Sequence, residues 1–202
     1  MKRIILSMIC VCFASMTLQA QNAGNARKVL DKTAAIISNK GGASANFKLT
    51  SQKNSTNGKI TIKGNKFHAT TPDGIVWYNG KTQWTYMKAN EEVNVNTPTE
   101  AQQAQMNPYQ FINLYKKGYA LGMKTISGNY QVHLTATDKK RSIQELYITI
   151  NSKTYLPSQV KMLQNGKWTT ITISNFKTLN VSDAVFTFNS KDFPEAEVID
   201  LR

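Results

Sequence analysis

Side chains able to act as nucleophiles, acids or metal ligands are scarce in this sequence. The two histidines, His68 and His133, form no HExxH motif and no pair at ligand spacing, and both fall in alternating segments that favour packing or surface roles. Glu91 and Glu92 form the visible acidic cluster, at a position typical of turn charge, and no glycine-rich phosphate loop occurs. These residues predict no enzyme, metal site or cofactor, although a site assembled from distant residues stays open.

The only cysteines, Cys10 and Cys12, lie in an N-terminal stretch typical of a secretory signal. Two basic residues precede an apolar run, and Ala20 offers a small residue before a cut. We therefore expect residues 1–20 to be a cleaved signal and residues 21–202 to form a single domain. That domain contains no cysteine, which excludes disulfides, thiol nucleophiles and cysteine-ligated metal sites.

The chain is strongly basic. Its formal net charge is +13, and removal of the signal would leave +11 on 182 residues. Such a charge fits an anionic partner, whether nucleic acid, a membrane surface or an acidic protein, and it equally fits lysines that are merely solvated.

The stronger chemical signal is apolar. Period-two alternation puts apolar side chains on one face of successive segments, opposite Lys, Thr, Asn and Gln. The sets are Phe47 and Leu49; Ile60 and Ile62; Trp84 and Tyr86; Val93 and Val95; Val132 and Leu134; and Leu146, Ile148 and Ile150. They predict one sheet with a single apolar face. Few helical turns are available to cover that face, so beside an ordinary core we expect a cavity or groove for an apolar ligand.

Turn signals divide these segments into a meandering antiparallel sheet. The turn pairs are Asn57-Gly58, Gly64-Asn65, Asn79-Gly80, Gly128-Asn129 and Asn165-Gly166. The predicted strands are 46–51, 59–63, 66–71, 75–78, 82–88, 93–96, 130–137, 144–151, 158–163, 168–176 and 186–188. The fold class is therefore mainly β with a few helices.

Two regions predict helix. Apolar residues between Ala26 and Ile37 recur at helical spacing, and Gly41-Gly42 ends that run. Residues 97–119 form an insert that begins with a capping box and contains a second helix over residues 108–117.

Residues 57–95 carry the motifs by which the chain resembles a known family. A lysine-bearing strand leads to Phe67, and the hairpin Gly80-Lys81-Thr82 is followed by Trp84 and Tyr86. A strand at 156–160, the Phe-x-Phe at 186–188 and the ending Val198-Ile199-Asp200 continue the pattern. Nearly the whole mature chain thus resembles the outer-membrane lipoprotein carrier (LolA-like) family.

The resemblance implies a curved, unclosed antiparallel β-barrel, a half barrel, with a helical lid over an apolar cavity. It implies a monomeric periplasmic carrier of acylated lipoprotein cargo. The carrier would receive cargo from an inner-membrane ABC transporter and deliver it to an outer-membrane acceptor or membrane, with no nucleic-acid partner. The alternatives are the outer-membrane acceptor of the same fold, against which the missing lipobox argues, and a secreted basic enzyme or nucleic-acid binder.

One departure concerns the lid. Proteobacterial members carry an arginine just before the Phe that holds the lid shut, whereas this chain has Lys63 and Lys66 near Phe67. Either lysine could supply the charge but not the bidentate fork.

Candidate cavity residues follow from the shared faces and the resemblance. The acyl cavity is predicted to involve Phe47, Leu49, Ile60, Ile62, Phe67, Trp84, Tyr86, Val93, Val95, Phe111, Leu114, Leu134, Leu146, Ile148, Val160 and Met162. The lid is predicted to involve Val29, Leu30, Ile37, Phe111, Ile112 and Tyr115. Trp77 and Met87 are further candidates, but periodicity does not orient the all-apolar run 75–78.

Overall fold

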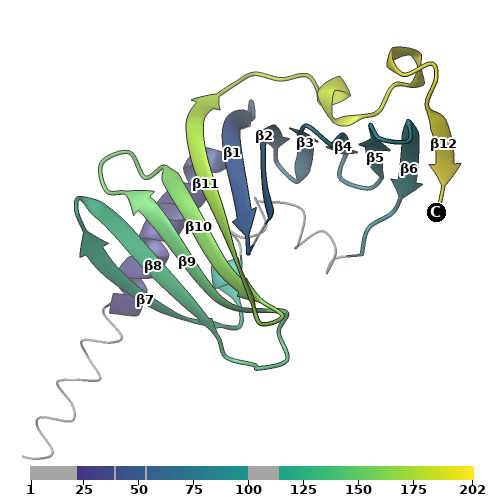
Figure 1. The fold of residues 1–202 in the computed structure, drawn as a ribbon. Coiled ribbons are helices and arrows are strands. Elements are labelled where there is room, and N and C mark those ends of the chain that lie inside the picture. The colour runs from purple at the N-terminus through teal and green to yellow at the C-terminus, as the bar shows by residue number, and fades with distance from the viewer. Residues whose placement is uncertain (1–21, 39, 53, 100–113) are drawn as a thin grey trace, which may run out of the picture.

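The computed structural model describes residues 22–38, 40–52, 54–99 and 114–202 (Figure 1). The predicted signal and most of the predicted helical insert, including Phe111 and Ile112, lie outside these residues. A helix covers residues 22–37 and ends before Gly41 and Gly42, as the apolar spacing predicts. No helix of the described ranges is long and apolar enough to cross a membrane.

Twelve strands form a single sheet in the described part of the chain. They are β1 (Ala43–Ser51), β2 (Asn54–Lys63), β3 (Lys66–Thr70), β4 (Gly74–Tyr78), β5 (Gln83–Met87), β6 (Glu92–Asn96), β7 (Tyr119–Ile126), β8 (Asn129–Ala136), β9 (Ile143–Asn151), β10 (Pro157–Gln164), β11 (Lys167–Thr178) and β12 (Glu197–Asp200). The same described residues contain three short 3-10 helices: η1 (Leu114–Lys116), η2 (Asp183–Phe186) and η3 (Ser190–Asp192).

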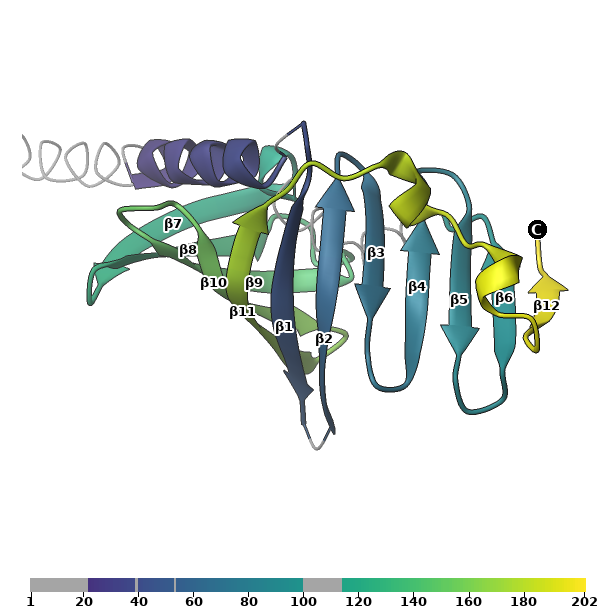
Figure 2. The same ribbon diagram turned by 90° about the horizontal axis from the view of Figure 1, so that it is seen from above.

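The sheet is curved but does not close. Its strand order is β12-β6-β5-β4-β3-β2-β1-β11-β10-β9-β8-β7. Neighbours are antiparallel except for β6 and β12, which pair in parallel. The edge strands β7 and β12 lie at opposite ends of the molecule, with the helix over the β7 half (Figure 2). The mainly β, unclosed half barrel expected from the sequence is therefore confirmed.

The hairpin turns largely follow the predicted pairs. Asn165 and Gly166 both have positive φ, 50° and 73°, which suits the tight turn between β10 and β11. Asn79 shapes the turn of the Gly80-Lys81-Thr82 motif, because its side-chain oxygen accepts hydrogen bonds from the backbone nitrogens of Lys81 (3.0 Å) and Thr82 (2.9 Å). This best-matched family motif is thus a structural turn.

The prediction of a turn at Asn57-Gly58 is wrong. Both residues lie inside β2, and the described side of the β1–β2 turn has its positive φ at Gln52, 47°. Gly58 is required for another reason. A Cβ there would lie 2.7 Å from the Phe47 ring and 2.1 Å from the Thr70 carbonyl oxygen. The glycine therefore makes room for a close cross-strand contact rather than for a bend.

Other differences cluster where strands are short or interrupted. The predicted strand 186–188 is wrong, because Phe186 ends the 3-10 helix η2, which Ser182 caps by accepting from the Ala184 nitrogen. Strands β7 and β12 were not predicted. Within the described end of the insert, only η1 is helical, and β7 already begins at Tyr119.

Candidate functional site

The helix packs on one face of the sheet, which we call the helix-side face; the opposite one is the outer face. Over β7 to β10, the helix contributes Ala26, Val29 and Leu30 to a buried apolar cluster. Its other buried members are Tyr115, Tyr119, Val132, Leu134, Ile143, Leu146, Ile148, Ile150, Val160 and Met162. Strand pairing aligns them, since Ile148 lies opposite both Val132 and Val160.

A second apolar cluster continues the helix-side face over β1 to β4. Ile37, near the end of the helix, packs there with Ala43, Ala45, Ile60, Ile62, Phe67 and Tyr78. Ile173 of β11 contacts both clusters, so the apolar surface runs without a break across most of the sheet.

The helix leaves part of this apolar surface incompletely covered. Phe47 and Leu49 pair with Ile173 and Ile171 on the same face, and all four side chains are only half-buried. They lie toward the ends of β1 and β11 that are distant from Ala43, which belongs to the same buried cluster as Ile37. Ile171 and Ile173 alternate within a predicted strand, and that spacing would have identified them as further members of the apolar face.

Most predicted site residues are brought together on the helix-side face. They are Phe47, Leu49, Ile60, Ile62, Phe67, Leu134, Leu146, Ile148, Val160 and Met162 from the sheet, Val29, Leu30 and Ile37 from the helix, and Leu114 and Tyr115 from η1. Their role in ligand binding stays a prediction.

The prediction of a single apolar face is wrong for Trp84, Tyr86, Val93 and Val95. Pairing places Tyr78, on the helix side, opposite Gln83, so Trp84 points to the outer face. Val95 lies opposite Trp84, and Val93 lies opposite Tyr86. The apolar face therefore changes sides at β4, where Val76 and Tyr78 point one way and Ile75 and Trp77 the other.

The apolar outer face at this end is covered by residues 179–202, which we call the C-terminal strap. The ring centroids of Phe188 and Phe193 lie 5.4 and 5.5 Å from that of Trp77, and Phe193 lies 4.8 Å from Tyr86. The strap then adds β12 to the sheet edge. Trp84, Tyr86, Val93 and Val95 thus belong to a second packing layer.

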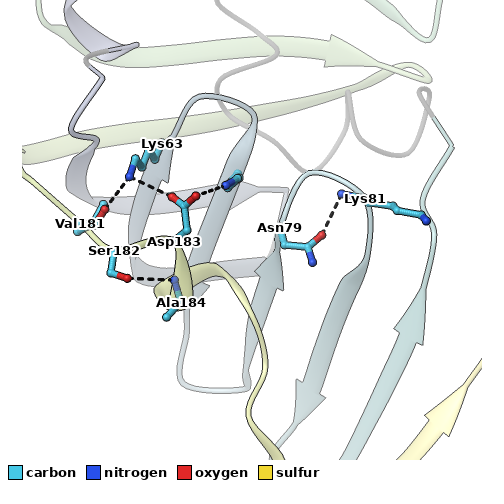
Figure 3. A network of polar contacts seen from close by, with 8 residues as sticks. Lys63, Asn79, Lys81, Val181, Ser182, Asp183 and Ala184 are labelled. Atoms are coloured by element: carbon cyan, nitrogen blue, oxygen red, sulfur yellow. Dashed lines mark hydrogen bonds and ion pairs between the residues drawn. The ribbon is translucent and has the colours of Figure 1, made fainter.

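The strap is also held by charge (Figure 3). Asp183 lies 2.6 Å from the Lys66 ammonium and 3.0 Å from that of Lys63, and Lys63 donates to the Val181 carbonyl at 2.9 Å. Hydrogen bonds from Lys66 and Lys63 hold the pKa of Asp183 below its ordinary value of 3.8. The two lysines considered as substitutes for the family's lid arginine therefore bind the strap.

Polar contacts fasten the helix itself, and no local sequence pattern predicts them. Thr33 is fully buried and donates to the Tyr155 carbonyl at 3.0 Å. The Tyr115 hydroxyl donates to Asp31, and the Lys32 ammonium lies 4.6 Å from the centre of the Tyr155 ring. These contacts link the helix to η1 and to the β9–β10 turn.

Neither histidine lies in a catalytic arrangement within the described residues. The His68 ring stacks on Trp77 at 5.6 Å, and burial, with a smaller effect of Lys59, lowers its pKa below 6.5. His133 stacks on Tyr147 at 4.1 Å on the outer face and lies 3.1 Å from Glu145. The same ranges contain no group of three or more His, Cys, Asp or Glu residues able to hold a metal ion.

A cavity of about 660 Å³ lies between the beginning of the helix and β7. It is lined by Asn22, Ala23, Gly24 and Arg27 and by the first four residues of β7. Among the residues that the structure describes, no predicted acyl-cavity residue lines it. Over β7 to β10, the apolar helix-side face is instead packed against the helix.

Comparisons with known proteins agree with this architecture. Residues 16–167, more than half of the chain, match the family model described as outer membrane lipoprotein carrier protein LolA. No curated protein sequence matches the chain significantly.

Among solved structures, an uncharacterized conserved protein from Thermus thermophilus superposes with a TM-score of 0.60 at 12% identity, covering 87% of this chain and 99% of that one. A DUF1329 family protein from Desulfovibrio piger gives a TM-score of 0.50 at 12% identity, with coverages of 82% and 97%. A LolA superfamily protein from Nitrosomonas europaea matches at a TM-score of 0.45 and 12% identity, covering 81% and 97%. With the family match extending over most of the sheet, the chain belongs to the outer membrane lipoprotein carrier (LolA) family.

Proposed function

We propose that this protein is a periplasmic carrier that binds the acyl chains of lipoproteins and moves them from the inner to the outer membrane. The observation that carries the proposal is the continuous apolar helix-side face, whose cover in the described structure is one helix together with the short η1, held by a few side chains. Such a cover can be displaced without taking the sheet apart.

The free energy of packing the helix on the sheet is similar in size to that of burying an acyl chain in its place, which suits a reversible carrier. Val29, Leu30 and Ile37 are at most 7% exposed, and exposing three such side chains costs about 5–9 kcal/mol. Burying a 16-carbon chain at roughly 0.8 kcal/mol per methylene contributes about 12 kcal/mol. An acyl chain can therefore replace the helix on the sheet with a net gain of a few kcal/mol.

The free energy of acyl-chain burial also determines which partners the carrier needs. A lipoprotein anchored by several acyl chains cannot leave a membrane unaided, and this sequence has no phosphate-binding loop with which to use a nucleotide. An inner-membrane ABC transporter would supply the energy for loading. Release would then follow from tighter binding by an outer-membrane acceptor or by the membrane itself.

The test is cargo capture by the intact protein. The full chain, expressed with its own leader in a bacterium with two membranes, should be recovered from the periplasm with bound lipoprotein and should release lipoproteins from inner-membrane vesicles. After removal of lipid, palmitate binding should persist at high salt, whereas binding to a nucleic acid would weaken steeply. Recovery without lipid, together with failure to release lipoproteins, would contradict the proposal.

A further inference from the structure

The helix-side face changes from apolar to polar between β4 and β5. One cross-strand row runs Ala43, Ile62, Phe67, Tyr78 and then Gln83 and Asn96. The neighbouring row runs Ala45, Ile60, Ala69, Val76 and then Thr85 and Asn94. We call Gln83, Thr85, Asn94 and Asn96 the polar strip. It carries three amides and one hydroxyl side by side, directly beyond the apolar surface.

The strip is not simply a solvated edge. Gln83 is only 4% exposed, and its amide nitrogen donates to the Thr85 hydroxyl at 3.1 Å. The side-chain oxygen of Asn96 is buried and has no hydrogen-bond partner among the residues that the structure describes. A buried acceptor without a donor is unusual in folded proteins and calls for a partner, such as a water molecule, an ion or the donor of a ligand. Thr85 and Asn94 are half-buried and lie opposite each other.

The chemistry of the strip matches neutral polar groups. Amides offer donors and acceptors together, and the hydroxyl does the same, so ester and amide groups of a ligand can be bound without charge. The two rows contain no charged side chain from β2 to β6, and Glu92 lies in the next row along the same face. The surface as a whole is apolar at one end and hydrogen-bonding at the other, as an acylated ligand is.

We propose that the polar strip binds the ester and amide groups at the head of the acylated N-terminal cysteine of a lipoprotein, while its acyl chains extend over the apolar rows toward β1. This inference rests on the proposed carrier function and adds a site for the part of the cargo that a fatty acid lacks. It predicts that the protein distinguishes a lipopeptide from a free acyl chain.

The test compares two probes on the full mature chain: a tripalmitoylated cysteinyl peptide and free palmitate. The variant Thr85→Val with Asn94→Leu removes hydrogen-bonding groups from the strip. The control, Thr149→Val with Gln131→Leu, changes a similar cross-strand pair on the outer face. The single variant Asn94→Ala serves as a second strip variant in case the double one folds poorly, and circular dichroism checks all three.

Loss of about two neutral hydrogen bonds should weaken lipopeptide binding by roughly tenfold or more, with palmitate binding and the control unchanged. Unchanged lipopeptide binding by a folded strip variant, or an equal loss of affinity for both probes, would contradict head-group binding by the polar strip while leaving the carrier proposal intact. Failure of the wild-type protein to bind either probe would instead contradict the carrier function.

Discussion

Weakening the contacts that fasten the helix should lower the stability of the protein and raise its affinity for cargo. The variant Thr33→Val with Tyr115→Phe removes the hydroxyl that donates to the Tyr155 carbonyl and the hydroxyl that donates to Asp31, while both side-chain shapes are kept. Opposite changes in stability and affinity are expected because the helix and the cargo compete for the same face.

The magnitude follows from the environment of the two bonds. A neutral hydrogen bond contributes about 0.5–1.5 kcal/mol and one to a charged group about 1.5–3 kcal/mol. Because Asp31 is exposed, we take the lower part of each range, about 2 kcal/mol together. Destabilising the closed state by about 2 kcal/mol raises the population of the open state roughly 30-fold, and the apparent affinity rises by up to the same factor.

The assay measures palmitate binding by titration and opening of the helix by hydrogen exchange of the amides in residues 22–37. The outer-face variant Tyr147→Phe with Thr149→Val is the matched control, since Tyr147 donates to Glu145 at 3.2 Å away from the helix. It should leave both measurements unchanged. Faster exchange of the helix with unchanged or weaker palmitate binding would refute the idea that the helix competes with cargo.

Three further outcomes follow from the structure. Ile148→Glu places a charge at a side chain only 1% exposed, so it should abolish palmitate binding and lower the urea midpoint; cargo transfer by a folded variant would show that this strand is not part of the site. The lowered pKa of Asp183 means that its contribution to stability is present above pH 3.8 and is lost as pH falls through the folded-state pKa. Asp183→Asn should therefore reduce the acid sensitivity of the urea midpoint between about pH 7 and 3. An unchanged pH dependence in this variant would count against the strap contacts. Because the pKa of His68 is lowered in the folded state, the unfolded chain binds this proton at higher pH than the folded chain does. The contribution of His68 to stability should therefore be full above pH 6.5 and fall below it. His68→Gln should reduce the loss of stability between about pH 7.5 and 5.5, and equal losses in the wild-type protein and the variant would contradict the burial of this ring.

The strands were predictable because local signals fix them. Asn165-Gly166 specifies a tight turn, and Leu146, Ile148 and Ile150 alternate with polar residues, so the pairing of β9 with its neighbours could be anticipated. The helix was predictable for the same reason, since its apolar spacing is regular.

The side of the sheet on which each apolar set lies was not predictable. Alternation relates residues within one strand but does not say which face points inward. Trp84 and Tyr86 alternate just as Ile60 and Ile62 do, yet they lie on opposite faces because the face changes within β4. A strand covered on both sides is apolar at every position, so its sequence carries no period.

Long-range contacts account for the remaining features that the sequence did not predict. Phe188 alternates with Phe186 in a strand-like way, but the strap crosses β4 and places Phe188 against Trp77. Thr33 and Tyr155 are linked by a hydrogen bond between residues 122 positions apart, which no local pattern encodes. The polar strip is visible only once the strand register places Gln83 beside Tyr78.

The most direct test of the carrier function is to map where an acyl chain binds. A palmitoylated peptide with a photoreactive group in its acyl chain, cross-linked to the protein and analysed by mass spectrometry, should label helix-side residues such as Leu49, Ile148 and Ile171. Labelling confined to the outer face, or to the cavity beside Asn22 and Arg27, would contradict the claim that the helix-side face carries the cargo.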